Sequence, residues 1–408
     1  MSNITRRQVI GGAVVTGLAA ISSALSSAEL AAAQSPAPES QLRLSGIRRV
    51  IIDTDPGNDD ALALIMGLRS PSLDVEAITV CPGNLGPNYE QQVKNALFLV
   101  DLAGRSGKVP VYAGMPHPIL NKPYPVATFI HGKYGLGNFE VPSVKQPAER
   151  EHAVDAMRRI ILQSPGEITI IALGGFTNIA MAMLRDPAFT RALKGILFVG
   201  GRYASPGLPP SYNVLVDPEA AHVVFTSGVP ITLVGADVIS RDSILHDEDF
   251  DHIAAFNTRL SRFFIQSNDL RRTFEKAHRG TTGSTNPDPI AIATAINPSL
   301  ALRYEPVFMQ VELQGELTRG LLVYGNDIYA GHPTPPPNAD ICVQASPEVF
   351  RQMVFSTLSA TDWDTGRCHL LAGRRVVPRQ NSIRAHNGAD VNSESRFAMT
   401  VDWRELDR

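Results

Sequence analysis

Cysteine is scarce in this chain, which has three in 408 residues. The three, Cys81, Cys342 and Cys368, do not stand at the spacing of a paired metal site. A disulfide framework is therefore not expected, although one bridge would be compatible with the sequence.

The chain also lacks a large excess of charge of either sign, with 37 Lys and Arg against 40 Asp and Glu. Proteins that bind nucleic acid or anionic membranes through surface charge normally carry a basic excess. Nucleic acid is therefore not an expected partner, and a small neutral molecule is the expected ligand. The composition, 44% hydrophobic and 19% charged, is that of a globular protein with a sizeable core.

The first 33 residues lack an apolar stretch long enough to span a membrane, because the segment is rich in Ala, Gly and Ser and contains Glu29. Arg6 and Arg7 precede this segment and three alanines, 31–33, end it, a pattern typical of a twin-arginine export signal. We therefore expect a signal peptide over 1–33, a linker over 34–47, and a periplasmic or secreted mature protein without a membrane span.

From residue 48 to residue 360, short apolar runs alternate with longer amphipathic ones. This order predicts βαβ units, and so an α/β fold with an open, mainly parallel, Rossmann-like central sheet and helices on both faces. Strands are expected at 49–52, 75–80, 109–112, 168–172, 196–199 and 231–234. Helices are expected at 59–68, 89–103, 153–162, 177–184, 218–226 and 250–271.

Two features follow near the end of the chain. The runs 307–313 and 317–324 predict a C-terminal antiparallel hairpin that joins the sheet. The polar segment 361–408 is expected to be an extension beyond the domain, either a solvated tail or a lid or oligomer contact.

Four carboxylates, Asp53, Asp55, Asp59 and Asp60, lie within eight residues where an expected strand runs into a helix. Like charges this close repel one another, so the cluster requires a cation or protons. Oxygen ligands at this density favour Ca²⁺ or Mg²⁺. Helix capping would account for Asp59 or Asp60 singly, but not for four carboxylates.

Polar residues also follow other expected strands. Ligands of open α/β sheets bind beyond the carboxyl ends of the strands, so we expect these segments to face one site. They are residues 83–84, 173–178, 200–201, 212–213 and 286–289.

These motifs, in this order, resemble those of the calcium-dependent nucleoside hydrolases of the inosine-uridine preferring type. They are residues 53–60, 79–84, 131–132 with 135–137, 173–178, 213 with 217–221, and 288–291. The resemblance covers residues 48–322 and implies the nucleoside hydrolase fold. It also implies an N-ribosyl hydrolase of the EC 3.2.2 type, which cleaves a ribonucleoside into base and ribose, and it suggests a homodimer or homotetramer.

The resemblance further implies a metal site and a general base. Asp55, Asp60 and Asp288, with the backbone carbonyl of Thr177, would bind Ca²⁺, which would hold the attacking water and the ribose hydroxyls. Asp55 would accept the proton of the water, and Asp53 would support the site from behind. Direct attack by water would invert the anomeric carbon.

The remaining site residues are assigned by the same resemblance. Asp59 and Asn84 would face the 2′-hydroxyl of the sugar and Asn213 its 3′-hydroxyl, while Asp288 would also contact substrate. Asn84 and His131 would join Asp55 as catalytic residues. A lone histidine in a glycine-rich loop is as often solvated as catalytic, so both alternatives are open for His131.

Three positions depart from the family pattern. Pro287 stands where many members have a histidine that protonates the leaving base, and Leu85 stands where the purine-preferring branch has an acidic residue. Ser211, expected to bind the sugar's 5′ end, replaces a glutamate. We therefore expect non-standard specificity, with His131, His278 or Tyr134 as substitutes in leaving-group activation.

Two other functions are compatible with parts of the sequence. An exported nucleoside or sugar binding protein would keep the metal site without efficient turnover, although retention of Asp55 argues for catalysis. An aspartyl phosphatase would also have two aspartates spaced by one residue after a strand, but Pro56, Gly57 and the second aspartate pair do not match that pattern.

Overall fold

The computed structural model describes residues 48–204, 209–325 and 335–360. The expected signal peptide, the linker and the polar extension over 361–408 lie outside the described residues. In the described part of the chain, no helix is long and apolar enough to cross a membrane.

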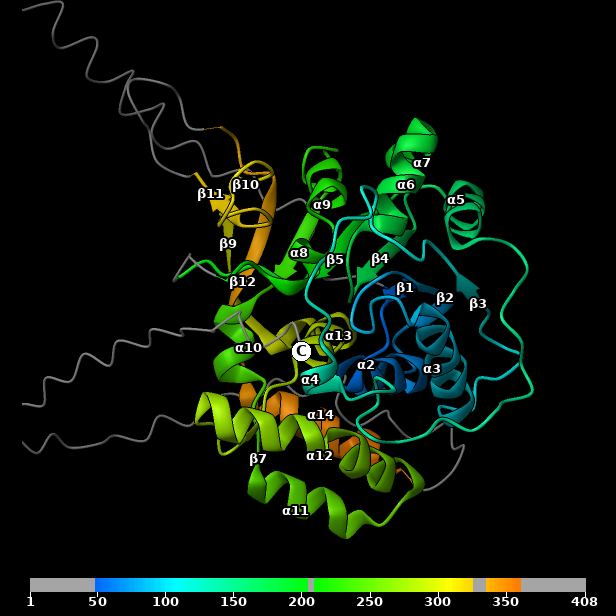
Figure 1. The fold of residues 1–408 in the computed structure, drawn as a ribbon, viewed down its shortest axis with the longest axis vertical. Helices are drawn as coiled ribbons and strands as arrows, with labels where there is room; N and C mark the ends of the chain where they lie inside the picture. Colours follow the sequence, from blue (N-terminus) through cyan, green and yellow to red (C-terminus); the bar gives the residue numbers. More distant parts are fainter. Residues whose placement is uncertain (1–47, 205–208, 326–334, 361–408) are drawn as a thin grey trace, which may run out of the picture. The chain divides into compact units, whose positions relative to one another are not determined.

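The central sheet has eight strands in the order β3-β2-β1-β4-β5-β6-β12-β9 (Figure 1). All neighbouring pairs are parallel except β12 and β9, so the predicted fold class is confirmed. The bounds are β1 Arg49–Thr54, β2 Asp74–Val80, β3 Val111–Ala113, β4 Ile168–Ala172, β5 Gly195–Val199, β6 Ile231–Val234, β12 Ala339–Ala345 and β9 Ala301–Val307.

Helices cover both faces of this sheet because alternate strand residues point to opposite sides. Val50 and Ile52 of β1 belong to one buried cluster, whereas Ile51 between them belongs to the other. The first face is covered by α2 (Asn58–Arg69), α3 (Tyr89–Leu102), α11 (Asp247–Phe256), α12 (Arg259–Arg279), α13 (Pro287–Ile296) and α14 (Pro347–Ser359). The second is covered by α5 (Ala153–Gln163), α6 (Thr177–Arg185), α7 (Pro187–Ala192) and α9 (Pro218–Phe225).

Short elements complete the described residues. Helix α4 (Thr128–His131) lies near α12 in Figure 1, and α8 (Tyr212–Val216) precedes α9. The others are α10 (Ala236–Asp242), the 3₁₀ helix Pro298–Leu300, and the pair β7 (Leu245–His246) and β8 (Gly283–Ser284).

Two predicted elements differ from the structure. The helix expected over 250–271 is two helices, α11 and α12, because Asn257 adopts a left-handed conformation and Thr258 caps α12 by accepting from the N–H of Ser261. The predicted hairpin exists as β10 (Met309–Val311) and β11 (Leu322–Tyr324), but it forms a separate two-stranded sheet. The antiparallel edge of the main sheet is formed by β9 against β12, which sequence periodicity did not predict.

Candidate active site

The acidic cluster lies in the turn between β1 and α2 and in the first turn of that helix. Gly57 is the N-cap of α2, and its N–H donates to Oδ2 of Asp60 at 2.8 Å. The hydroxyl of Thr54, the last residue of β1, donates to Oδ1 of the same carboxylate. Asp55, Asp59 and Asp60 are all buried, because the strand carries this segment from the sheet directly into the core. A helix N-terminus partly compensates such charges.

Asp288 reaches the same place from the first turn of α13, which packs against α2. One carboxylate oxygen from each of Asp59, Asp60 and Asp288 lies within 4.8 Å of the other two. Burial, followed by the charge of Asp59, raises the pKa of Asp60 to about 6. Burial and the neighbouring carboxylates likewise raise the pKa values of Asp55 and Asp288 well above the usual range.

Asp59 differs from its neighbours because it has a cationic partner. A terminal nitrogen of Arg271, on α12, lies 2.9 Å from Oδ2 of Asp59, and both side chains are buried. Burial opposes ionisation of Asp59, but the charges of Arg271 and His131 outweigh it, so the pKa of Asp59 is lowered.

The four carboxylates around the site thus divide into two groups. Asp59 is paired with Arg271, whereas no ion pair reaches Asp55, Asp60 or Asp288 from the described residues. Three buried carboxylates with raised pKa values favour a bound divalent cation. The donor set consists of hard oxygen atoms, so these residues fit Ca²⁺.

Asp55 is enclosed by backbone. The N–H of Asn84 donates to its Oδ2 at 2.8 Å. A Cβ atom at Gly83 would lie 1.7 Å from that oxygen, and one at Gly174 would lie 2.6 Å from Oδ1. The turns after β2 and β4 therefore both press against Asp55, and only glycine allows so close an approach.

The side-chain N–H groups of Asn84 and Asn213 donate hydrogen bonds within the protein. The amide of Asn84 donates to the backbone carbonyl of Asp55 at 2.9 Å and to Asp60 at 3.3 Å. The amide of Asn213, on α8, donates to the carbonyls of Leu173 and Val199 at 2.5 and 3.0 Å. Each side chain is thereby fixed, and its amide oxygen is left to accept a hydrogen bond.

Thr177 and Ser211 lie in segments that adjoin this cluster. Thr177 is the first residue of α6, and its hydroxyl donates to Oδ2 of Asp217 at 2.7 Å. Ser211 precedes α8, and its hydroxyl oxygen lies against Gly200. The metal-binding role of the Thr177 carbonyl and the substrate role of Ser211 stay predictions.

His131 is buried at the end of α4 and is not the solvated loop histidine that the sequence left open. Its Nδ1 lies 2.9 Å from Oδ1 of Asn58, whose own amide N–H donates to the carbonyl of Ile130. The backbone N–H of Asn58 also lies 3.3 Å from Nδ1, so Asn58 contacts this nitrogen through both its backbone and its side chain. Burial lowers the pKa of His131 to about 4 although Asp59 is 3.6 Å away, so the ring is neutral at neutral pH.

Asp53 supports the cluster from within the sheet. Its Oδ1 accepts from the hydroxyl of Thr79 at 2.7 Å and from the amide of Asn178 at 2.9 Å. Burial raises the pKa of Asp53 to about 7. The hydrogen bonds tie β1, β2 and α6 together directly behind the site.

Sequence reasoning missed two residues around the cluster, Arg271 and Tyr124, and the burial of a third, Tyr212. Arg271 contacts Asn58, which is 213 residues away in the chain, so no local pattern could reveal it. Tyr124 donates to the carbonyl of Gly83 at 3.2 Å. Tyr212 has a buried hydroxyl without a hydrogen-bond partner among the described residues, and burial, then the charge of Asp55, raises its pKa. Residues 212–213 were expected to face the site, but the burial of the Tyr212 hydroxyl was not predicted.

Known proteins resemble this chain over most of its length. Residues 50–352 match the family model described as inosine-uridine preferring nucleoside hydrolase. The pyrimidine-specific ribonucleoside hydrolase RihA of Citrobacter koseri is 32% identical over 313 residues, which cover 76% of this chain and 97% of the relative. The inosine-uridine preferring nucleoside hydrolase of Leishmania major is 34% identical over 281 residues, 68% of this chain and 87% of that protein.

Solved structures give the same result. A plant nucleoside hydrolase, the PpNRh1 enzyme, superposes with a TM-score of 0.70 at 30% identity and covers 77% of this chain and 99% of its own. A purine-preferring ribonucleoside hydrolase from Gardnerella vaginalis superposes with a TM-score of 0.69 at 29% identity, covering 76% of this chain and 98% of its own.

Proposed function

The chain belongs to the inosine-uridine preferring nucleoside hydrolase family and is an N-ribosyl hydrolase, and we propose that it cleaves ribonucleosides with the help of Ca²⁺ and with non-standard specificity. One observation carries the calcium assignment. Asp55, Asp60 and Asp288 are each buried without an ion pair from the described residues, and the charges of Asp60 and Asp55 act on Asp288, whereas Asp59 beside them has Arg271. Ca²⁺ binds carboxylate oxygens of this kind, whose negative charge is not balanced by a basic side chain.

Bound at these carboxylates, Ca²⁺ would hold the attacking water and lower its pKa. The residues of the chain then divide the remaining work. Asp55, fixed by the N–H of Asn84, accepts the proton of the water. Oδ1 of Asp59 is buried and has no hydrogen bond from the described residues, so it is available to the 2′-hydroxyl of the sugar. Negative charge at this place also stabilises an oxocarbenium-like transition state.

The free amide oxygens of Asn84 and Asn213 complete the sugar site. Because their N–H groups are held by backbone carbonyls, each amide oxygen has one orientation and can accept from a ribose hydroxyl. We assign Asn84 to the 2′-hydroxyl side and Asn213 to the 3′-hydroxyl. Ser211, just before α8, is assigned to the 5′ end of the sugar.

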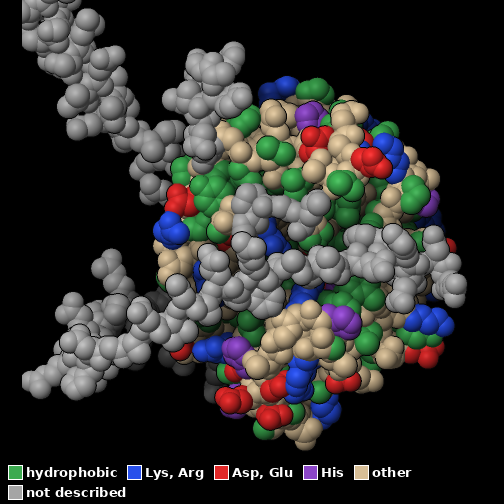
Figure 2. All heavy atoms as spheres, turned by 60° about the vertical axis from the view of Figure 1, so that its left-hand side comes forward, with side chains coloured by type: hydrophobic (Ala, Val, Ile, Leu, Met, Phe, Trp, Pro, Cys, Tyr) green, Lys and Arg blue, Asp and Glu red, His purple; other side chains and the backbone are tan. Residues whose placement is uncertain are grey.

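The leaving-group side supports non-standard specificity. Pro287 opens α13 and has no proton to give. The ring of His131 is neutral at neutral pH, and its Nδ1 is occupied by contacts with Asn58. We therefore propose a substrate whose base departs without a strong general acid. On the face shown in Figure 2, acidic and basic side chains of the described residues are interspersed.

A comparison of three substrates tests this proposal. With Ca²⁺ present, p-nitrophenyl riboside, whose leaving group needs no acid, should be cleaved much faster than inosine or uridine, and chelation should abolish the activity. Asp55→Asn should abolish cleavage while ribose still binds. Equal rates before and after chelation would contradict the calcium assignment, and efficient cleavage of inosine and uridine would contradict the leaving-group assignment.

The same experiment separates catalysis from binding. An exported nucleoside or sugar binding protein would bind ribosides tightly and release no free base. This alternative is not favoured, because the relatives and solved structures reported above are hydrolases.

We also propose export by the twin-arginine route and assembly as a homodimer or homotetramer. The support for export is Arg6 and Arg7 before an apolar segment that ends in three alanines. Replacing both arginines by lysine should retain the protein in the cytoplasm, and light scattering of the mature protein should give its oligomeric state.

A further inference from the structure

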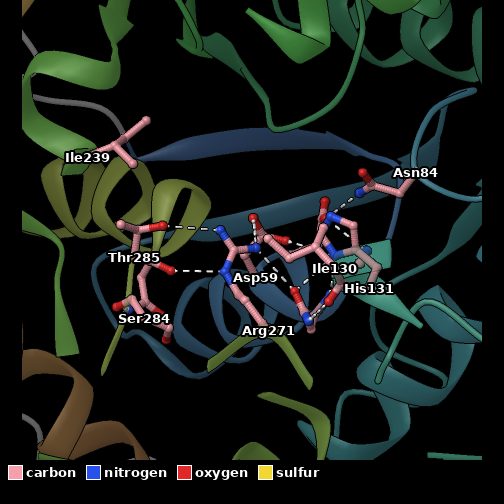
Figure 3. A network of polar contacts seen from close by, with 12 residues as sticks. Asp59, Asn84, Ile130, His131, Ile239, Arg271, Ser284 and Thr285 are labelled. Atoms are coloured by element: carbon pink, nitrogen blue, oxygen red, sulfur yellow. Dashed lines mark hydrogen bonds and ion pairs between the residues drawn. The ribbon is translucent and has the colours of Figure 1, made fainter. Parts of the chain in front are cut away.

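Arg271 is buried although it carries a charge, and nearly all its donors are directed at protein acceptors. Its Nε–H donates to the carbonyl of Thr285 at 3.1 Å, and one terminal nitrogen contacts Asp59 at 2.9 Å and Asn58 at 3.2 Å. The other terminal nitrogen lies 3.4 Å from the hydroxyl of Thr285. Figure 3 shows the guanidinium between Asp59 on one side and Thr285 on the other.

Glu275, one helical turn further along α12, fixes this arrangement. It is fully buried, lies 3.3 Å from Nε of Arg271, and accepts from the N–H and the hydroxyl of Thr285 at 2.7 Å each. Thr285 in turn lies three residues before Asp288. Arg271 therefore joins three segments of the site, namely the start of α2, helix α12 and the approach to α13.

The contact between Arg271 and Asp59 is made by one carboxylate oxygen only. Oδ2 of Asp59 is held by the guanidinium, while Oδ1 is buried and lacks a hydrogen bond from the described residues. Asp59 is nevertheless close enough to Asp60 and Asp288 to serve as a third ligand for a shared cation. The Asp59 carboxylate could therefore either coordinate the cation or accept a hydrogen bond from the sugar, and its surroundings determine which.

We propose that Arg271 is the positioning residue that reserves Asp59 for the sugar. By neutralising Asp59 and holding its Oδ2, the guanidinium keeps this carboxylate out of the metal coordination and directs Oδ1 at the 2′-hydroxyl. The inference rests on the proposed function, which assigns Asp59 to that hydroxyl. Lysine, a point charge without the planar fork of arginine, reproduces the charge but not the geometry.

Calorimetry with Ca²⁺, D-ribose and 2-deoxy-D-ribose tests the proposal without relying on turnover. The calcium-loaded wild type should bind ribose about tenfold to a hundredfold more tightly than 2-deoxyribose, as expected for a hydrogen bond to a charged group. Arg271→Gln should bring this ratio close to one while Ca²⁺ affinity is unchanged or increased. Arg271→Lys should give an intermediate ratio.

Two comparisons separate positioning from general stability. Arg272→Gln removes the adjacent arginine, which pairs with Asp247 at 2.6 Å, and should leave the ratio as in the wild type. In an Asp59→Asn background, Arg271→Gln should not lower the ratio of ribose to 2-deoxyribose affinity any further. If Arg271 acts only through the Asp59 carboxylate, its substitution has no effect once that carboxylate is gone.

The proposal is overturned if Arg271→Gln leaves the sugar ratio unchanged, or if the two substitutions reduce it additively. It is also overturned if the wild type does not distinguish the two sugars. Because these measurements use binding, they remain decisive even if the calcium-loaded protein cleaves no riboside, the outcome that would instead refute the proposed function. If Arg271→Gln does not fold, Arg271→Lys supplies the test: a ratio below that of the wild type supports the proposal, and an unchanged ratio overturns it.

Discussion

Asn84 and Asp55 hold each other by reciprocal hydrogen bonds at the ends of two neighbouring strands. The N–H of Asn84 donates to the carboxylate of Asp55 at 2.8 Å, and the side-chain amide of Asn84 donates back to the backbone carbonyl of Asp55 at 2.9 Å. The same amide lies 3.3 Å from Asp60. One residue thus fixes the proposed base and contacts a proposed metal ligand.

Replacing Asn84 by alanine should lower kcat/KM about tenfold to a hundredfold, because Asp60 and the carbonyl of Asp55 lose a donor and the sugar loses an acceptor. Steady-state kinetics with p-nitrophenyl riboside measure this effect. Asn88→Ala is the matched control, since Asn88 is exposed and its side chain does not cap α3. Equal kinetics for the two variants would show that Asn84 has no part in the site.

Removal of Ca²⁺ should reverse the pH dependence of stability. Burial raises the pKa of Asp60 from 3.8 to about 6, and the pKa values of Asp55 and Asp288 are also raised. Without metal, each of these groups favours the folded state while protonated, and this contribution is lost as the pH rises through its folded pKa. Ca²⁺ binds the ionised groups, so its contribution increases over the same range.

Thermal unfolding in chelator and in excess Ca²⁺ measures this reversal. Between about pH 5 and pH 7, Tm should fall in chelator and should hold or rise with Ca²⁺. Parallel curves under the two conditions would mean that no ion binds at these carboxylates.

Pro287→His should increase the rate of cleavage of substrates whose leaving base must be protonated by a general acid. Pro287 is the first residue of α13, directly before Asp288, and the family resemblance places a leaving-group histidine at this position. The variant should raise kcat/KM for inosine and uridine, relative to p-nitrophenyl riboside, by about tenfold or more. Pro287→Gln shares the loss of proline but has no titratable group, so an equal gain in that variant would exclude proton transfer as the cause.

Local sequence was sufficient where the relevant residues are close in the chain. Asp55, Asp59 and Asp60 follow directly after an apolar strand, and the structure places all three in one buried cluster. Asp288 was assigned to the same site by the resemblance of residues 288–291 to the family motif, and the structure places its carboxylate beside those of Asp59 and Asp60. The break between α11 and α12 was missed, although Asn257 followed by Thr258 and Ser261 is a local signal for a C-cap and then an N-cap.

Long-range partners could not be predicted in this way. Arg271 and Arg272 are adjacent in the sequence, yet only Arg271 faces the site, because the packing of α12 decides which side of the helix is buried. The neutral state of His131 likewise depends on burial by segments distant in sequence. Strand β9 was missed because its exposed residues do not give a clear alternation of apolar and polar side chains.

The tight enclosure of Asp55 by Gly83 and Gly174 limits how this protein can diverge. Any larger residue at either glycine would displace the Asp55 carboxylate. Substitutions there would therefore abolish activity rather than change the substrate preference. New substrate preferences are therefore expected to arise at positions that do not contact Asp55, such as Ser211 and Pro287. An effort to retarget the enzyme should therefore vary Ser211 and Pro287 and leave both glycines untouched.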